Sequence, residues 1–251
     1  MKLTVLGASG TYPRAGGACN SFLISEGTTA ALLDIGPGSL SNLFRWPEHE
    51  LVKVLFLSHL HPDHLSDIFS YRYYLQLSAA KSCLPVTVLA PAGAREQILS
   101  FSADPNVTAF DEVFSFSELR AGESYVIGGL TIEPFAAKHV GATFGARVSG
   151  KQGVVYYSSD TGWDEQLAVH ARGADLLICE ATLRQSDVGK GVAHLSGEQA
   201  GSLAEKAGVG RLLLSHLWAH YDPAEILASA QAVCRAPVEL AREGAVYRVG
   251  E

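Results

Sequence analysis

The apolar run LVKVLFLS at residues 51–58 leads directly into HLHPDH at residues 59–64. A short continuous apolar run is typical of a buried strand, and such a strand must end at the edge of a sheet. Three of the chain's nine histidines and one aspartate follow that strand within six residues. A packed core does not accept so many adjacent polar rings. The fold must therefore bring further groups to this strand end.

Composition limits what the rest of the chain can be. The 251 residues are enough for one large α/β domain or two small ones, and 47% of them are hydrophobic against 18% charged, so we expect a sizeable core. A net charge of −7 argues against a broad basic surface for nucleic acid. An anionic substrate remains compatible, because bound cations reverse the local field.

Neither secretion nor a membrane is indicated. The opening MKLTVLGASG has no signal-peptide pattern, and no run of about 18 apolar residues exists, so no membrane partner is expected. The cysteines form no CxxC pair, and each is expected to be a small buried hydrophobe in a reduced, cytoplasmic compartment. They are Cys19, Cys83, Cys179 and Cys234.

Strand and helix patterns alternate through both halves of the chain. Glu26-Gly27 predicts a hairpin, Ser66 is a candidate N-cap for a helix over 66–80, and Ser196 with Gln199 predicts a capping box. No Ser/Pro/Gly-rich linker divides the halves. We therefore expect one α/β domain, residues 1–251, in which two mixed sheets pack together and helices cover their outer faces.

Polar side chains recur where predicted strands end, the position at which open α/β sheets hold ligands. Asp34 ends its own strand in LLDIG, and seven further residues follow four other strands. The seven are His59, His61, Asp63, His64, His139, Asp160 and His216.

Imidazoles with carboxylates suit zinc, with manganese or iron as alternatives. Residues 59–64 alone offer too many ligands for one tetrahedral ion, which indicates two neighbouring ions. Asp160 is the expected bridge, because a carboxylate has two oxygens and can span two ions. The expected sets are His59, His61 and His139 on one ion, and Asp63, His64 and His216 on the other.

HLHPDH resembles the signature of the metallo-β-lactamase fold superfamily. Further motifs resemble its ribonuclease Z-type group: LGASGTYP, KHVGATFGARV, SSDTG, and GADLLICEAT followed by HLSGEQA. The resemblance spans nearly the whole chain. It implies a four-layer αβ/βα sandwich with two zinc ions, and it pairs Glu180 with His194.

One departure concerns the substrate. Bacterial-type ribonucleases Z carry a long arm for transfer RNA between the third histidine motif and the bridging aspartate, whereas here only 20 residues separate His139 from Asp160. The arm-less pattern is similar to small cytoplasmic phosphodiesterases, some of which hydrolyse cyclic nucleotides. We therefore expect a small phosphodiester as the substrate rather than a large RNA. A homodimer is an expectation at the level of the family.

The remaining roles follow from chemistry and resemblance together. Asp63 is expected to bind one ion and to orient the attacking water, and Asp34 to fix the tautomer of a ligand imidazole. His194 is expected to contact the scissile phosphate or to protonate the leaving oxygen, with Glu180 holding its other nitrogen. The alternative for His194 is an ordinary surface histidine. Trp218 is expected either to stack on a base in the pocket or to be structural.

Four functions stay open at this point. The first is a dinuclear-zinc phosphodiesterase and the second a nuclease trimming RNA 3′ ends. The third is a thioester, lactone or sulfate-ester hydrolase. A scaffold protein with a decayed site ranks last, because all seven ligands are present. β-Lactam hydrolysis is disfavoured, because those enzymes place a cysteine where Asp160 stands.

Overall fold

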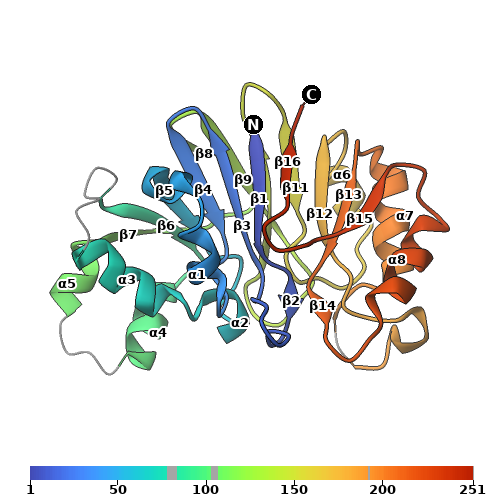
Figure 1. Cartoon of the computed structure of the whole chain (residues 1–251), viewed down its shortest axis with the longest axis horizontal. Coiled ribbons are helices and arrows are strands. Elements are labelled where there is room, and N and C mark those ends of the chain that lie inside the picture. The colour runs from blue at the N-terminus through green and yellow to red at the C-terminus, as the bar shows by residue number, and fades with distance from the viewer. Residues whose placement is uncertain (78–83, 103–106, 192, 251) are drawn as a thin grey trace.

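Two stacked sheets between outer helices make up the computed structural model (Figure 1). It describes residues 1–77, 84–102, 107–191 and 193–250, so Cys83 and the end of the helix expected over 66–80 lie outside the described residues. Each large sheet has seven strands. This arrangement is the αβ/βα sandwich that the resemblance implies.

The first sheet runs in the order β16-β1-β3-β4-β5-β6-β7. Its first three pairings are antiparallel and its last three parallel. A turn at 27–28 joins β3 to β4, as the Glu26-Gly27 pair predicts. The strands are Val246–Arg248, Lys2–Gly7, Ser21–Glu26, Thr29–Leu33, Val52–Phe56, Val86–Ala90 and Phe114–Glu118.

The second sheet runs in the order β15-β13-β12-β11-β10-β9-β8. It repeats the scheme, with three parallel pairings followed by three antiparallel ones. The strands are Val238–Leu240, Leu212–Ser215, Leu176–Glu180, Val154–Tyr157, Phe144–Ser149, Leu130–Ala136 and Tyr125–Ile127.

A third, two-stranded sheet joins the two halves at the lower edge of Figure 1. In it, β2 (Ser9–Gly10), which follows β1, pairs in parallel with β14 (Leu217–Trp218), which follows β13. Segments from the two large sheets therefore meet through backbone pairing at this edge.

Helices cover the outer face of each large sheet (Figure 1). Those on the first sheet are α1 Ser39–Leu43, α2 Pro62–Leu65, α3 Ile68–Leu77, α4 Ala94–Phe101 and α5 Val107–Asp111. Those on the second sheet are α6 Gln166–His170, α7 Gly197–Ala207 and α8 Pro223–Gln231. Two 3₁₀ turns complete the elements, at Pro47–Leu51 and Gln185–Asp187.

The alternation of side chains along each strand creates three apolar layers. In β5, Val54 and Phe56 face the other sheet, whereas Leu55 faces the helices. In β12, Ile178 faces the first sheet and Leu177 faces α7 and α8. Because both faces of these strands are buried, successive residues are apolar, and the strands therefore appear in the sequence as continuous apolar runs.

The expected N-cap at Ser66 is wrong. Ser66 has helical backbone angles at the C-terminal end of α2, and its hydroxyl donates to the Pro62 carbonyl at 2.6 Å. The apolar periodicity predicted a helix that starts at residue 66. Proline instead starts the short helix α2 at residue 62, and α3 begins at Ile68. The capping box at Ser196 and Gln199 is confirmed.

No helix among the described residues is long and apolar enough to cross a membrane.

Phe56 tests the layer between the sheets. Its side chain is fully buried there, so Phe56→Ala should lower the free energy of unfolding by about 3–5 kcal/mol, through lost burial and the cavity left behind. Phe101 is 62% exposed, and Phe101→Ala should change it by less than about 0.5 kcal/mol. Urea unfolding followed by circular dichroism measures both. Equal effects would contradict this account of the core.

Candidate metal centre

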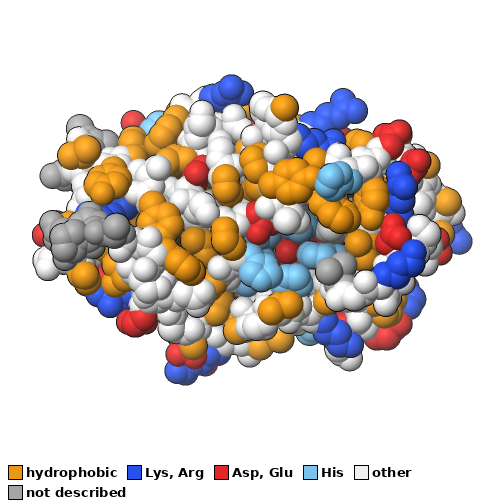
Figure 2. Space-filling view, turned by 90° about the horizontal axis from the view of Figure 1, so that it is seen from below, with side chains coloured by type: hydrophobic (Ala, Val, Ile, Leu, Met, Phe, Trp, Pro, Cys, Tyr) orange, Lys and Arg blue, Asp and Glu red, His pale blue; other side chains and the backbone are white. Residues whose placement is uncertain are grey.

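The predicted site residues lie at one end of the sheets, beyond the carboxyl ends of β5, β9, β11 and β13. Figure 2 shows histidine side chains gathered around a hollow in this face, with acidic side chains at its floor. All seven predicted ligands are brought together there, although they come from both halves of the chain.

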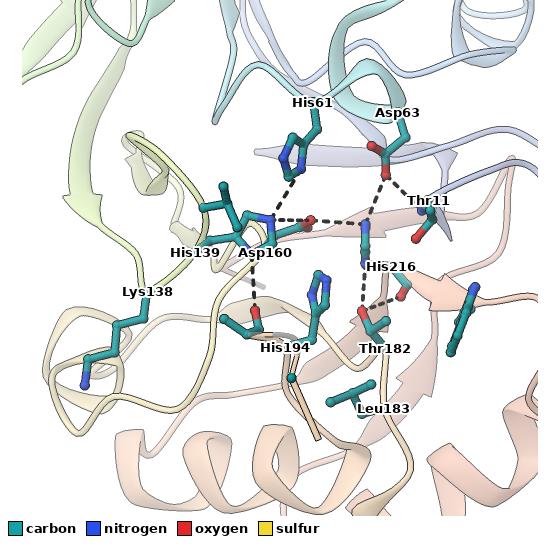
Figure 3. Close-up of a pocket in the computed structure, with 14 residues that line it drawn as sticks. Thr11, His61, Asp63, Lys138, His139, Asp160, Thr182, Leu183, His194 and His216 are labelled. Atoms are coloured by element: carbon teal, nitrogen blue, oxygen red, sulfur yellow. Dashed lines mark hydrogen bonds and ion pairs between the residues drawn. The ribbon is translucent and has the colours of Figure 1, made fainter. Parts of the chain in front are cut away.

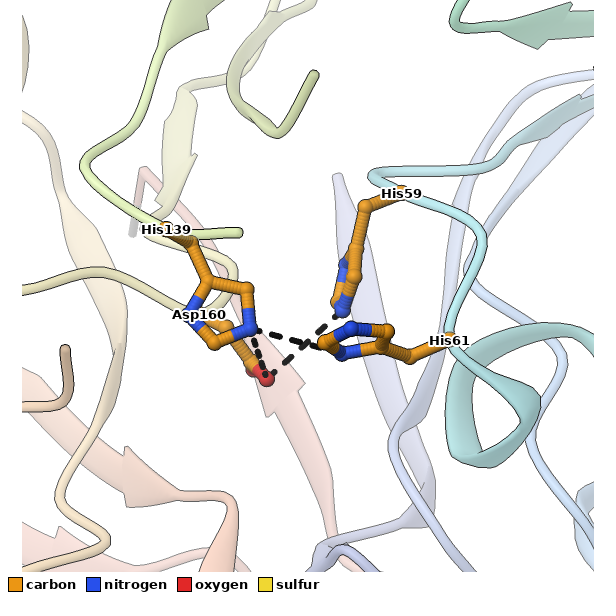
Figure 4. A group of neighbouring side chains, drawn as sticks. All are labelled: His59, His61, His139 and Asp160. Atoms are coloured by element: carbon orange, nitrogen blue, oxygen red, sulfur yellow. Dashed lines mark hydrogen bonds and ion pairs between the residues drawn. The ribbon is translucent and has the colours of Figure 1, made fainter. Parts of the chain in front are cut away.

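The first group of donors contains three imidazoles turned toward one carboxylate (Figure 4). Donor atoms of His59, His61, His139 and Asp160 all lie within 4.8 Å of one another. His59 Nε2 and His139 Nε2 are each 3.7 Å from Asp160 Oδ2. This spacing leaves room for one ion at the centre, because metal–nitrogen bonds are about 2.0–2.1 Å long.

The second group contains Asp63, His64 and His216, again within 4.8 Å. His216 Nε2 lies 3.3 Å from an oxygen of Asp63 and 3.3 Å from Asp160 Oδ2. His64 Nε2 lies 3.3 Å from the other oxygen of the same carboxylate, Asp160 Oδ1. Asp160 is thus in contact with both groups, which is where the sequence interpretation put a bridge.

The backbone is strained where it delivers these groups. Asp34, Ser159 and His216 have φ values of 57°, 54° and 53°, in the left-handed region that non-glycine residues rarely adopt. Each lies just beyond the end of a strand. Gly10 packs so closely on His216 that a Cβ there would lie 2.6 Å from its Nδ1. Strain of this kind persists only where the surrounding structure enforces it, and it is typical of functional sites.

Asp34 lies behind the donors and is fully buried. Its Oδ2 accepts hydrogen bonds from His64 Nδ1–H at 2.7 Å and from the Tyr157 hydroxyl at 2.6 Å. The Ser58 hydroxyl also donates to Oδ2, at 2.8 Å, and the Ser58 backbone N–H donates to Oδ1. These contacts fix the ring of His64 with Nε2 facing Asp160.

Ser58 fixes a second ring. Since its hydroxyl proton goes to Asp34, Ser58 Oγ accepts from His59 Nδ1–H at 3.0 Å. Burial lowers the pKa of His59 to about 2, so this imidazole is neutral. Its Nε2 lone pair then points at Asp160.

Thr182 fixes the ring of His216. Its hydroxyl oxygen lies 2.7 Å from His216 Nδ1 and 2.8 Å from Glu180 Oε2. When the hydroxyl donates to the carboxylate, the oxygen accepts His216 Nδ1–H, and Nε2 is left to face Asp63 and Asp160. The sequence interpretation missed Thr182. The one signal for it is its place directly after the strand that carries Glu180.

Glu180 also holds His194, as the resemblance implies. His194 Nδ1–H donates to Glu180 Oε1 at 2.9 Å, and the carboxylate further accepts the backbone N–H groups of Thr161 and Leu195. Burial alone would lower the pKa of His194, but the Glu180 carboxylate outweighs it and raises this pKa to about 9. The Glu180 carboxylate therefore favours the cationic form of His194. Its donor atom also lies within 4.8 Å of those of Asp160 and His216.

The electrostatics of the cluster fit bound cations. His59 Nε2, His64 Nε2 and Asp160 Oδ1 are buried and have no hydrogen-bond partner among the described residues. Burial by itself would raise the pKa of Asp160, yet the imidazoles of His216 and His64 hold it well below its usual range. The neutral His59 presents a lone pair to Asp160 Oδ2 at 3.7 Å, and this contact is repulsive unless positive charge lies between the two atoms. The cluster therefore supports divalent metal binding.

A backbone contact from the glycine-rich loop completes the second group. Thr11 has a φ of 65° and its N–H donates to Asp63 Oδ2 at 2.8 Å. The loop thereby orients the Asp63 carboxylate. Backbone donors of this kind leave no trace in residue type.

A cavity of about 760 Å³ opens onto both groups (Figure 3). His61, Asp63 and His194 line it, together with Lys138 and Trp218. His220 is not among its lining residues and packs against Trp218.

Residues 29–217 match the model of the beta-lactamase superfamily domain. The chain belongs to this superfamily. The probable metallo-hydrolase YhfI of Bacillus subtilis is 27% identical over 258 residues, covering 98% of this chain and 99% of the relative. Its crystal structure superposes with a TM-score of 0.87, at 26% identity, over 98% of each chain.

Two further proteins are similar to the chain over nearly its whole length. Uncharacterized protein Rv1339 of Mycobacterium tuberculosis is 32% identical over 246 residues, covering 95% of this chain and 88% of the relative. The short form of human tRNase Z has a TM-score of 0.80 at 21% identity and covers 99% of each chain. This beta-lactamase-fold hydrolase thus has the same fold as a ribonuclease Z-type enzyme.

Thr182 gives a direct test of how the donors are fixed. Thr182→Val keeps the shape but removes the hydroxyl, so that His216 Nδ1–H loses its acceptor, and metal affinity should fall about 10- to 100-fold. Thr182→Ser keeps the hydroxyl and should retain most of the affinity. Competition with a chromogenic chelator measures both variants. If Thr182→Val binds metal as tightly as the wild type, the hydroxyl does not orient His216.

Proposed function

We propose that this hydrolase is a dinuclear-zinc phosphodiesterase that acts on a small phosphodiester such as a cyclic nucleotide. Manganese or iron are the alternative metals. The observation that carries the proposal is the shared carboxylate of Asp160, with one imidazole group on each side of it. Zinc is the preferred metal because both groups combine imidazoles with carboxylates.

The region before Asp160 favours a small substrate. Residues 140–159, all described, contain only β10, β11 and their connections, so nothing in this stretch extends toward a folded RNA. Lys138 is the one Lys or Arg among the described residues that line the cavity, and its Nζ pairs with Asp164 at 3.3 Å. Polynucleotide binding depends on several cationic contacts to phosphates.

Two divalent cations, when bound, would neutralise the phosphoryl oxygens and acidify a water molecule toward neutral pH. The ligands would be the seven residues named above, with Asp160 between the two groups. Asp63 is held at one carboxylate oxygen by Thr11 N–H. Its other oxygen can accept a hydrogen bond from the attacking water and so direct that water's lone pair at phosphorus.

His194 supplies the proton. Its Nδ1–H is bonded to Glu180, and the ring lines the cavity, so Nε2–H is the remaining donor. A cationic imidazole contacts the phosphate and can protonate the departing oxygen. Glu180 acts through His194 by holding its orientation and charge.

Location and assembly stay predictions from the sequence, as a cytoplasmic protein and a homodimer. The alternative activities on the same scaffold are outcomes of the substrate test below.

A substrate panel on metal-reconstituted protein tests the proposed activity. Bis-p-nitrophenyl phosphate and cyclic AMP should be hydrolysed, and the purified protein should contain about two transition-metal ions per chain by mass spectrometry. His64→Ala removes a buried ligand and should lower turnover at least about 100-fold, which controls for contaminating activity. Faster cleavage of a precursor tRNA, or activity on lactones or thioesters alone, would overturn the proposal.

His194 is tested separately from the ligands. His194→Ala should lower kcat by about 100- to 10,000-fold through loss of the proton donor, with the metal content unchanged. Glu180→Gln should lower kcat less and move the alkaline limb of the pH profile to lower pH, because the ring loses the anionic partner that raises its pKa. His49→Ala, whose ring bonds the Trp46 carbonyl away from the cavity, is the matched control. Unchanged turnover in His194→Ala would remove His194 from the mechanism.

A further inference from the structure

The wall of the cavity beyond the metal donors is apolar. Val140, Leu183 and Trp218 line it, and Figure 2 shows hydrophobic side chains bordering the hollow that holds the histidines. Since Lys138 is paired with Asp164, this wall offers little to a second phosphate. It offers contact area to an uncharged part of the substrate.

Trp218 is the largest side chain of this wall and is fixed by its backbone. It lies in β14, opposite Gly10 of β2, two residues after the donor His216. The indole is therefore tied to the strand end that positions part of the metal group. A group bound against it stays at a set distance from the reacting phosphate.

Neighbouring rings hold the indole without stacking on it. His220 and Tyr221 meet Trp218 at interplanar angles of 90° and 88°, with centroids 5.1 and 5.2 Å away. Tyr221 is anchored in turn, because its hydroxyl donates to Asp187 and the Arg184 guanidinium lies 4.6 Å from its ring. Among the described residues, no ring or cation lies parallel over the Trp218 indole.

We propose that Trp218 is the specificity-determining residue of the site and stacks on the nucleobase of a mononucleotide diester whose phosphate lies at the metal groups. The inference rests on the proposed phosphodiesterase function and names the substrate class, a diester with one phosphate and one planar base. A cavity of about 760 Å³ is within the range of pockets that enclose ligands of this size. Stacking tolerates any base, since every base has a π-face.

Two substrates with the same leaving group isolate the contribution of the base. Thymidine 5′-(p-nitrophenyl phosphate) carries a base and methyl p-nitrophenyl phosphate does not, and both release p-nitrophenolate. The preference is the ratio of their kcat/KM values. Trp218→Leu, which keeps an apolar side chain without a ring, should lower this preference about tenfold, mainly through KM for the nucleotide. Trp218→Phe, which keeps a ring, should retain it within about threefold.

A binding measurement gives a readout without turnover. Stacked bases quench indole emission, and the other two tryptophans, Trp46 and Trp163, do not line the cavity. Adenosine 5′-phosphate should quench the emission of the zinc-loaded wild type, whereas ribose 5-phosphate, which lacks the base, should not. The quenching should disappear in Trp218→Phe.

The outcomes separate the two proposals. If the wild type cleaves neither diester, the phosphodiesterase function fails, and the emission titration still decides whether a base stacks on Trp218. If both diesters are cleaved and Trp218→Leu keeps the full preference, the stacking role is overturned while the phosphodiesterase stands. The stacking role is also overturned if ribose 5-phosphate quenches the emission as much as adenosine 5′-phosphate does. Quenching that persists in Trp218→Phe overturns it as well.

Discussion

Asp160 lies buried among imidazoles whose ring nitrogens are held toward it, and the rest of the site is arranged around this buried negative charge. A buried carboxylate with no countercharge is among the costliest features a fold can contain. Here ring nitrogens of His59, His64 and His216 lie 3.3–3.7 Å from its oxygens and are fixed by partners behind them. Divalent cations at the centre of the cluster would supply that countercharge, so metal binding would stabilise this end of the molecule.

The two sheets supply the rigidity that this arrangement needs. Each ends with parallel strands whose carboxyl ends meet at the same edge, and the sheets pack through a single apolar layer. Left-handed residues at Asp34, Ser159 and His216 turn the chain sharply just past the strand ends. Strain of about 1–3 kcal/mol at each such position is supported by the packing of the strands below. The site is therefore precise because it is built on strand ends rather than on long loops.

The sequence predicted the elements whose signals are local. The motif at 59–64 identified four donors, because ligands adjacent in sequence remain adjacent in the fold. The capping box at Ser196 and Gln199 marked where α7 begins. The prediction for Ser66 failed because a serine can stand at either end of a helix. The helical turn that starts at Pro62 places Ser66 at the C-terminal end of α2.

What the sequence could not supply is the set of partners behind the donors. Thr182, Ser58 and Tyr157 are ordinary residues in strands or just beyond them, and each becomes informative only when its hydroxyl is found against a buried imidazole or carboxylate. The backbone N–H of Thr11 is beyond any reading of residue type. Long-range pairings of this kind arise from how the two sheets face each other, which a single sequence does not encode locally.

The metal donors and the apolar wall of the cavity are different sets of residues. The donors and their partners must satisfy the geometry of metal ions, so they set the chemistry but not the substrate. The substrate is selected by side chains that are not metal donors, namely Lys138, which is paired with Asp164, and the apolar wall around Trp218. Because β14 ties Trp218 to the strand end that carries His216, a change in the wall alters which molecule is held without moving the donors. Specificity on this scaffold can therefore vary while the reaction stays the same.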